Sequence, residues 1–223
     1  MSAFLKLFIL LFTFGSPDVA LPDAAPSPIG QCDAADGSER VQWTEAERMQ
    51  VRRRVKAACK DLGASPILCA YYDAVVVRES SGMASVRHHK GKNENGLGPM
   101  GLSLRWHADK WPGRDEDPAF CTPEVSLAVA HAIVWRAFER YHAESLLDVQ
   151  AIYGGRWECG VDPATGARSC WADPNHRTES AVCSRMKAKG YSCHAILTEH
   201  DLGRKLPFGK RRAWVERLLG RPL

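Results

Sequence analysis

At 223 residues, of which 45% are apolar, the chain can bury one sizeable hydrophobic core plus an extension, but not two large domains. Thirty basic residues against 26 acidic ones give a net charge of only +4. Because the charge excess is small and no basic patch with interleaved aromatic residues stands out in the core region, the composition does not favour a nucleic-acid partner.

The first 20 residues have the pattern of a secretory signal. Lys6 precedes the apolar run Leu7 to Phe14, which is too short to span a bilayer but matches the apolar segment of a signal peptide. Asp18 disfavours cleavage after Ala20, so an uncleaved anchor or a buried core helix is the alternative. Residues 21–42 are then expected to be a proline-rich linker. The sequence thus predicts an exported protein, in the periplasm, in the cell envelope or outside the cell.

Eight cysteines, an even number in a chain with an export signal, are expected to form disulfides. The sequence does not choose among the possible pairings, and local spacing merely favours Cys59–Cys69, Cys159–Cys170 and Cys183–Cys193. Cys193 and His194 near Cys183 match no familiar zinc-ligand spacing, so neither a metal site nor a cofactor is predicted.

Two helices are expected before residue 83. Thr44 followed by Glu47 is a capping box that starts the first helix. The second should run from Ser65-Pro66 to Gly82, because its apolar residues follow the i, i+3, i+4 spacing of one helical face. The β-branched run Val75–Val77 favours a strand by itself. The helical spacing of apolar residues over the whole segment outweighs this preference.

The second helix would deliver Glu79 into a Ser/Gly-rich turn with apolar rings behind it. A carboxylate packed against apolar groups is suited to act as a general acid near neutral pH. The competing interpretation is a surface ion pair with Arg78 or Arg87. The following stretch, 82–99, is expected to be a polar loop with His88-His89 at its surface.

The remaining core should be helical as well. Thr122-Pro123-Glu124 is a strong helix start, and the segment Val125–Tyr141 is apolar on nearly every side, so it is expected to be the buried central helix. His131 within it is interpreted as a hydrogen-bonded core histidine. Ser145 with Asp148 three residues later predicts a further short helix.

Three motifs in this region occur in a fixed order: Glu79-Ser80-Ser81, then Gly96-Leu97-Gly98-Pro99-Met100-Gly101-Leu102, then Ala151-Ile152-Tyr153-Gly154-Gly155. The order and spacing resemble the Glu-Ser pair, the Gly-Leu-Met-Gln loop and the Ala-x-x-Tyr-Asn-x-Gly turn of the soluble lytic transglycosylase family, in the lysozyme superfamily. The resemblance covers about residues 43–157 and implies a mainly α, lysozyme-like domain. The sequence departs from the family motifs at two positions. Gly101 stands where the loop motif has glutamine, and Gly154 stands where the turn motif has asparagine.

The resemblance also implies a substrate and site roles. The substrate would be the glycan strands of peptidoglycan, cleaved at the MurNAc-GlcNAc β-1,4 bond with formation of 1,6-anhydro-muramic ends. Glu79 would act first as acid and then as base. Ser80 would orient the carboxyl group or a sugar amide, Met100 would line the groove and Tyr153 would bond near the carboxylate. Apart from the resemblance, a glycine at Gly98 would let the backbone pass close to a ligand, with a simple tight turn as the alternative.

Two other functions stay open. A hydrolytic lysozyme similar to the goose-type enzymes would need a second carboxylate, for which Asp73, Glu94 and Asp109 are candidates. A non-catalytic glycan-binding protein of the envelope is suggested by the two departures, Gly101 and Gly154.

From residue 158 onward the family pattern ends. Residues 158–223 are expected to form an accessory extension, with a disulfide-stapled loop region over 159–193. Lys210–Leu219 predicts a short basic amphipathic helix. Packing of Trp214, Val215 and Leu218 on the domain is favoured over contact with an anionic envelope surface. The sequence leaves the oligomeric state open.

Overall fold

The computed structural model describes residues 29–34, 39–90, 94–103, 107–113, 117–161, 164–173 and 181–223. The expected signal segment, residues 1–20, lies outside the described residues, as do residues 21–28 of the expected linker. Within the described ranges, none of the helices has the length and apolar character needed to cross a membrane.

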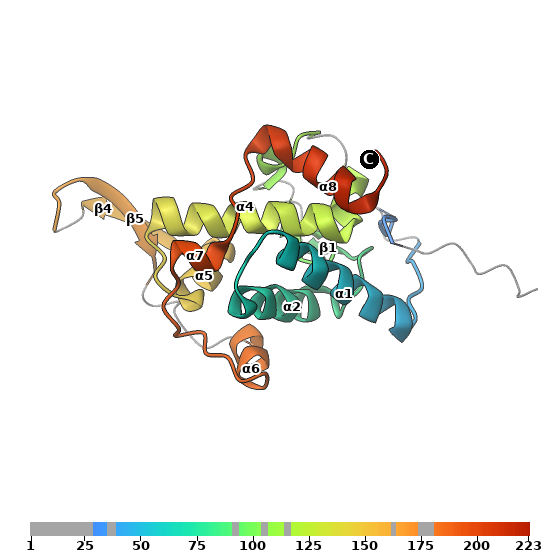
Figure 1. The fold of residues 1–223 in the computed structure, drawn as a ribbon, viewed down its shortest axis with the longest axis horizontal. Coiled ribbons are helices and arrows are strands. Elements are labelled where there is room, and N and C mark those ends of the chain that lie inside the picture. Colours follow the sequence, from blue (N-terminus) through green and yellow to red (C-terminus); the bar gives the residue numbers. More distant parts are fainter. Residues whose placement is uncertain are drawn as a thin grey trace, which may run out of the picture.

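The fold is mainly helical, as the sequence predicted. The helices are α1 (Glu45–Asp61), α2 (Pro66–Ser80), α4 (Pro123–Tyr141), α5 (Leu146–Tyr153), α6 (Ala181–Lys187), α7 (Glu199–Leu202) and α8 (Arg211–Leu219), with 3-10 turns η2 (Ala108–Lys110), η3 (Asp117–Cys121) and η5 (Phe208–Lys210). The strands are β1 (Arg87–Lys90), β2 (Glu94–Leu97), β3 (Leu102–Ser103), β4 (Trp157–Val161) and β5 (Arg168–Ala172). Helix α4 crosses the middle of the molecule, with α1 and α2 on one side and α8 on the other (Figure 1).

Local caps set the helix ends, much as predicted. Oγ1 of Thr44 accepts a hydrogen bond from the backbone N of Glu47 at 3.3 Å, and the Glu47 carboxylate accepts one from the backbone N of Thr44 at 2.7 Å. Ser145 and Asp148 form the same capping box at α5. At the end of α2, Ser81 already adopts the left-handed conformation, with φ 54°, one residue before the expected glycine.

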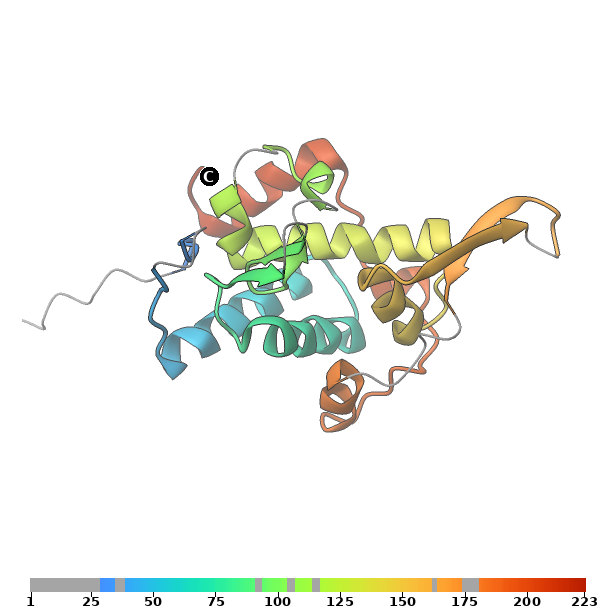
Figure 2. The same cartoon turned by 180° about the vertical axis from the view of Figure 1, so that it is seen from behind.

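The stretch 82–99, expected to be a polar loop, instead contributes β1 and β2 to a small antiparallel sheet, seen on the face shown in Figure 2. β1 pairs with β2, and β2 pairs with β3. Leu97 and Leu102 are fully buried and Val86 nearly so, which holds the sheet against the helical core. His88-His89, expected in a surface loop, lie in β1.

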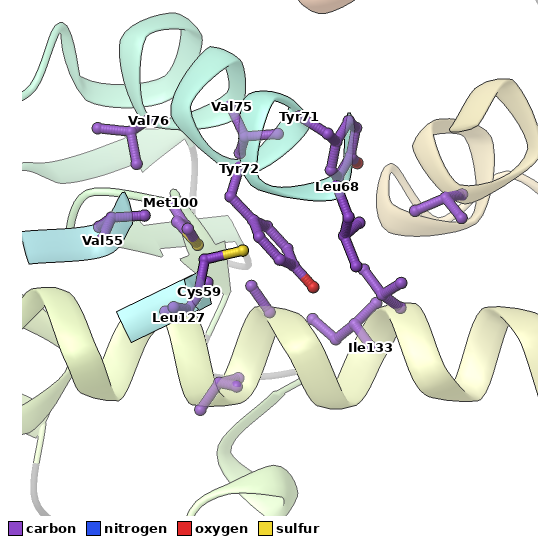
Figure 3. Packing of buried hydrophobic residues seen from close by; sticks show 14 of the residues in the cluster. Val55, Cys59, Leu68, Tyr71, Tyr72, Val75, Val76, Met100, Leu127 and Ile133 are labelled. Atoms are coloured by element: carbon purple, nitrogen blue, oxygen red, sulfur yellow. The ribbon is translucent and has the colours of Figure 1, made fainter. Parts of the chain in front are cut away.

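A single hydrophobic cluster holds the described fold together, and α4 is central to it, as predicted. Figure 3 shows Tyr72 of α2 directing its hydroxyl toward α4. This hydroxyl lies 2.9 Å from Nδ1 of His131, whose Nε2 lies 3.0 Å from the carbonyl of Arg204. Burial lowers the pKa of His131 to about 4, so the ring is neutral and can accept a hydrogen bond from Tyr72. It is the hydrogen-bonded core histidine that the sequence indicated.

The cluster continues past residue 157, where the sequence suggested a domain boundary. Met186, Leu202 and Val215, all in the 158–223 extension, are fully buried in the same cluster. The segment 159–193, expected to be a stapled loop region, contains most of the β4–β5 hairpin and the helix α6. The hairpin projects away from the body beyond the end of α4 (Figures 1 and 2).

Helix α8 corresponds to the predicted amphipathic helix at Lys210–Leu219. Trp214 and Val215 are buried, so the favoured packing role is confirmed. The carboxylate of Asp61, the last residue of α1, accepts hydrogen bonds from Nε1 of Trp214 at 2.8 Å and from Arg217 at 2.7 Å. These bonds tie α8 to α1. Contact of the basic side chains of α8 with an anionic envelope surface stays a prediction.

All eight cysteines are paired, in the bonds Cys32–Cys121, Cys59–Cys69, Cys159–Cys170 and Cys183–Cys193. The last three confirm the pairs favoured by local spacing. The first joins the expected linker to the segment that precedes α4. Four disulfides indicate an oxidising environment, outside the cytoplasm.

Candidate functional site

A cleft of about 670 Å³ lies where the end of α2, the small sheet, α4, α5 and the base of the β4–β5 hairpin meet. Backbone forms a large share of its wall, because the lining includes the glycines Gly96, Gly101, Gly154 and Gly155. The other described lining residues are Arg78, Glu79, Ser103, His107, Lys110, Ile133, Arg136, Tyr141, Ile152 and Trp157.

Helix α2 places Glu79 in the cleft, at its penultimate residue. The side chain is half-buried. Burial, and to a smaller extent the charge of Glu79, raises the pKa of the Tyr71 hydroxyl. Burial likewise raises the pKa of the Tyr153 hydroxyl, with the charge of Glu79 contributing. The carboxylate therefore acts on the hydroxyls of Tyr71, from its own helix, and Tyr153, from α5.

The glycine-rich loop is a tight turn between the sheet and this carboxylate. Gly98 has φ +72°, and a Cβ there would lie 2.0 Å from the carbonyl oxygen of Phe120, so only glycine fits. The backbone N of Gly101 donates to the carbonyl of Gly98 at 3.1 Å, which closes the turn. Gly101 then contacts the side chain of Glu79. Gly98 is buried and shapes the turn, whereas Gly101 lines the cleft.

Ser80, expected to orient the carboxyl group or a sugar amide, is instead buried and bonded to backbone. Its Oγ lies 2.9 Å from the carbonyl oxygen of Val76 and 3.0 Å from that of Pro99, and it accepts a hydrogen bond from the backbone N of Gly82. The side chain therefore fastens the glycine-rich loop to the end of α2. The reason is that the serine follows Glu79 on the helix and points toward the core.

Met100, expected to line the groove, is fully buried instead. In Figure 3 its side chain lies between α2 and α4, among the other core residues. Its backbone carbonyl accepts a hydrogen bond from the Tyr153 hydroxyl at 2.8 Å. Tyr153 thus holds the loop from the end of α5, one residue away from the glycine that contacts Glu79.

The three sequence motifs therefore meet at one place. The end of α2, the turn 98–101 and the end of α5 are joined by the hydrogen bonds of Ser80 and Tyr153 to loop carbonyls. Of the five predicted site residues, Glu79 lines the cleft. Ser80, Gly98, Met100 and Tyr153 are not among its lining residues and position the loop that forms its wall.

Comparison of the chain with protein-family models, curated proteins and solved structures finds no match. The chemistry of the cleft is therefore inferred from its own residues.

The other carboxylates named as candidates do not join Glu79 in the described cleft. Asp73 is buried and accepts two hydrogen bonds from Arg52, at 2.7 and 2.9 Å, and one from Lys189, so its role is structural. Asp109 has a side chain that is 58% exposed and paired with Lys110, and it lines a neighbouring groove. The side chain of Glu94 lies outside the described part of the molecule.

Sequence reasoning missed the cationic and aromatic parts of the lining. Arg78, Lys110 and Arg136 give the described wall three cations against the single acid Glu79. Ile133 and Arg136 are three positions apart on α4, a spacing visible in the sequence. Because nearly every face of that helix is apolar, the spacing did not reveal which face meets the cleft. Trp157 comes two residues after the last motif and carried no pattern of its own.

Among the described residues, no group of three or more His, Cys, Asp and Glu side chains is placed to hold a metal ion. His107 lines the cleft, with its ring centre 6.4 Å from that of Tyr153. The described cleft thus offers one half-buried carboxylate, an imidazole and three cations. This set of groups can bind an anionic ligand and transfer a proton.

Proposed function

We propose that the chain is a peptidoglycan lytic transglycosylase that cleaves the MurNAc-GlcNAc β-1,4 bond, with Glu79 as the proton-transfer group. The observation that carries the proposal is the meeting of three motifs, far apart in the sequence, around one cleft-lining carboxylate. A lysozyme-like fold is part of the proposal, and the mainly helical core supports it.

In the proposed reaction, the Glu79 carboxyl group donates its proton to the glycosidic oxygen, and the bond from that oxygen to C1 of the muramic acid breaks. The acetamido group of the substrate steadies the positive centre at C1. The Glu79 carboxylate then accepts the proton of the C6 hydroxyl, and the C6 oxygen bonds to C1. The proton that Glu79 donates stays on the leaving hydroxyl, and the proton of the C6 hydroxyl restores the protonated Glu79. No water is consumed, so one protein carboxylate is sufficient.

The charges of the cleft support a substrate of this class. Peptidoglycan carries carboxylates on its stem peptides. Arg78 and Arg136 line the cleft in which such a strand would lie, together with Lys110, which is paired with Asp109. Cations at a cleft raise the local concentration of an anionic ligand. The four disulfides support a location in the periplasm, in the envelope or outside the cell, where this substrate occurs.

Digestion of purified peptidoglycan, with mass analysis of the fragments, tests the proposal. Wild-type protein should release fragments with 1,6-anhydro ends, one water mass lighter than the products of hydrolysis. Glu79→Gln keeps the side-chain shape but cannot transfer the proton, so we expect a loss of about 10³-fold or more. Asp109→Asn should cost much less, because Asp109 is not among the described residues that line the cleft, and this variant also tests the hydrolase alternative.

Two other outcomes would replace the proposal. Reducing ends in the products, together with dependence on Asp109 or Glu94, would indicate a hydrolase. Binding of the glycan without any turnover would indicate a non-catalytic binding protein.

A further inference from the structure

Trp157 is exposed at the end of the cleft and has no role in the proposed chemistry. It is the first residue of β4, it lines the cleft, and 45% of its surface is exposed. Burial of a large apolar side chain stabilises a fold, so an indole left open at a cleft forgoes part of that stabilisation. A ligand that covers the ring would recover it.

The ring of Trp157 is held in place by a contact with Tyr141 and by the backbone of the hairpin. Tyr141, the buried last residue of α4, has its ring centre 5.1 Å from that of Trp157, with the planes tilted by 44°. The guanidinium carbons of Arg136 and Arg140 lie 5.8 and 5.9 Å from the centre of the Tyr141 ring. The buried tyrosine therefore packs against the indole and has two cations near its own ring.

The hairpin fixes the backbone of Trp157 as well. In the β4–β5 ladder Trp157 pairs with Ala172, which is buried, and two residues further on the Cys159–Cys170 disulfide joins the same two strands. A ring that is fixed before the ligand arrives loses little conformational freedom on binding.

We propose that Trp157, supported by Tyr141, is a saccharide-stacking subsite of the cleft, which binds one N-acetylhexosamine ring of the glycan at the hairpin end. A pyranose ring presents a face of C–H groups that packs on an indole, while its hydroxyl and amide groups stay available for the polar lining. The subsite rests on the proposed function for its choice of ligand, and it adds a binding residue that takes no part in the proton transfer at Glu79.

Binding of chitotetraose, the uncharged tetramer of N-acetylglucosamine, tests the subsite. This probe has no carboxylate, so the cations of the cleft contribute little to its affinity. Binding is measured by calorimetry in the Glu79→Gln background, where no turnover can occur. Adding Trp157→Thr removes the ring and keeps a residue that favours strands. We expect the affinity to fall tenfold or more, and Trp157→Phe to retain most of it.

Trp171 is the matched control. It lies in β5 of the same hairpin, its ring is next to Gly160, and it is not among the residues lining the cleft. Trp171→Thr should leave the affinity unchanged. The subsite is overturned if chitotetraose does not bind the Glu79→Gln protein, if Trp157→Thr binds it equally well, or if Trp171→Thr weakens binding as much.

The binding experiment and the digestion experiment test different claims, so either one can fail without the other. Dependence of binding on Trp157 without cleavage of peptidoglycan would support the subsite and reject the proposed chemistry. Cleavage by wild-type protein with unchanged binding by Trp157→Thr would support the chemistry and reject the subsite. A shift of tryptophan emission on binding, lost in Trp157→Phe, gives a second readout that reports on this ring itself.

Discussion

A Cβ built on Gly101 would lie 3.0 Å from Oε2 of Glu79 and 3.2 Å from its Cβ, so the loop backbone and the carboxylate side chain are in direct contact. Gly101 also has φ +61°, which disfavours any residue with a Cβ. A residue with a Cβ at this place, such as the glutamine that the resemblance would imply, requires the Glu79 side chain to shift by a few tenths of an ångström. The departure at residue 101 is therefore coupled to the placement of the carboxylate.

Gly101→Ala should displace the Glu79 side chain by a few tenths of an ångström and reduce glycan cleavage by up to about tenfold, since a misplacement of about 1 Å costs about 10²-fold. Rates of fragment release from peptidoglycan measure this. Gly190→Ala is the matched control, because Gly190 has φ +80° but nothing within 4 Å of a Cβ. If both variants lose stability equally and neither loses activity, the contact does not position the carboxylate.

Arg54→Met should destabilise the fold by about 3–5 kcal/mol, because it leaves the buried carboxylate of Glu124 without its partner. The guanidinium donates two hydrogen bonds to this carboxylate, at 2.8 and 2.6 Å, and so joins α1 to the start of α4. Urea unfolding measures the change. The neighbouring Arg53 is exposed, and Arg53→Met should cost little. Equal effects of the two variants would contradict a structural role for the ion pair.

Stability should fall as the pH is lowered from about 6.5 to about 4, because of His131. Burial lowers the pKa of this residue from its ordinary value of 6.5 to about 4, so in that window the unfolded chain binds a proton that the folded chain does not. The shift corresponds to about 3 kcal/mol, present above pH 6.5 and lost on acidification. Unfolding by urea at pH 7 and pH 4 measures it, and His131→Gln should flatten the dependence. An NMR titration that gave His131 an ordinary pKa would contradict this account.

A chain ending at residue 157 should not fold cooperatively, although the sequence suggested that 158–223 is an accessory. The truncation removes Met186, Leu202 and Val215, all fully buried in the common cluster. In the full-length chain, Leu202→Ala should cost about 2–5 kcal/mol, whereas Phe208→Ala should cost much less because Phe208 is 47% exposed. Thermal melting of the three proteins tests this. If the truncated chain melted cooperatively at a temperature close to that of the full chain, residues 158–223 would be an accessory after all.

The helices were predictable because their signals are local. The capping boxes at Thr44 and Ser145 act within four residues, and the spacing along α2 was enough to place Glu79 at the end of a helix with rings behind it. The local disulfides follow the same rule, since 10 or 11 residues separate the cysteines in the three predicted pairs.

The sheet and most of the cleft depend on contacts between distant residues. β1 and β2 are polar strands, and their pairing places Arg87 opposite Leu97. Their sequences lack the alternation of apolar and polar residues that would have predicted strands. Met100 was expected in the groove, but α2 and α4, which precede and follow the loop, close over it. Trp157 and Arg136 meet at the cleft only because the base of the hairpin packs against the end of α4.

The Cys32–Cys121 bond encloses both Cys59 and Cys69 along the chain, and its partners are 89 residues apart. A chain exported from its N-terminus presents Cys32, Cys59 and Cys69 to the oxidant before Cys121 arrives. An oxidant that joins cysteines in order of arrival would pair Cys32 with Cys59, and only exchange through a mixed disulfide would correct it. Production of the native protein therefore calls for a host compartment that has a disulfide isomerase as well as an oxidase.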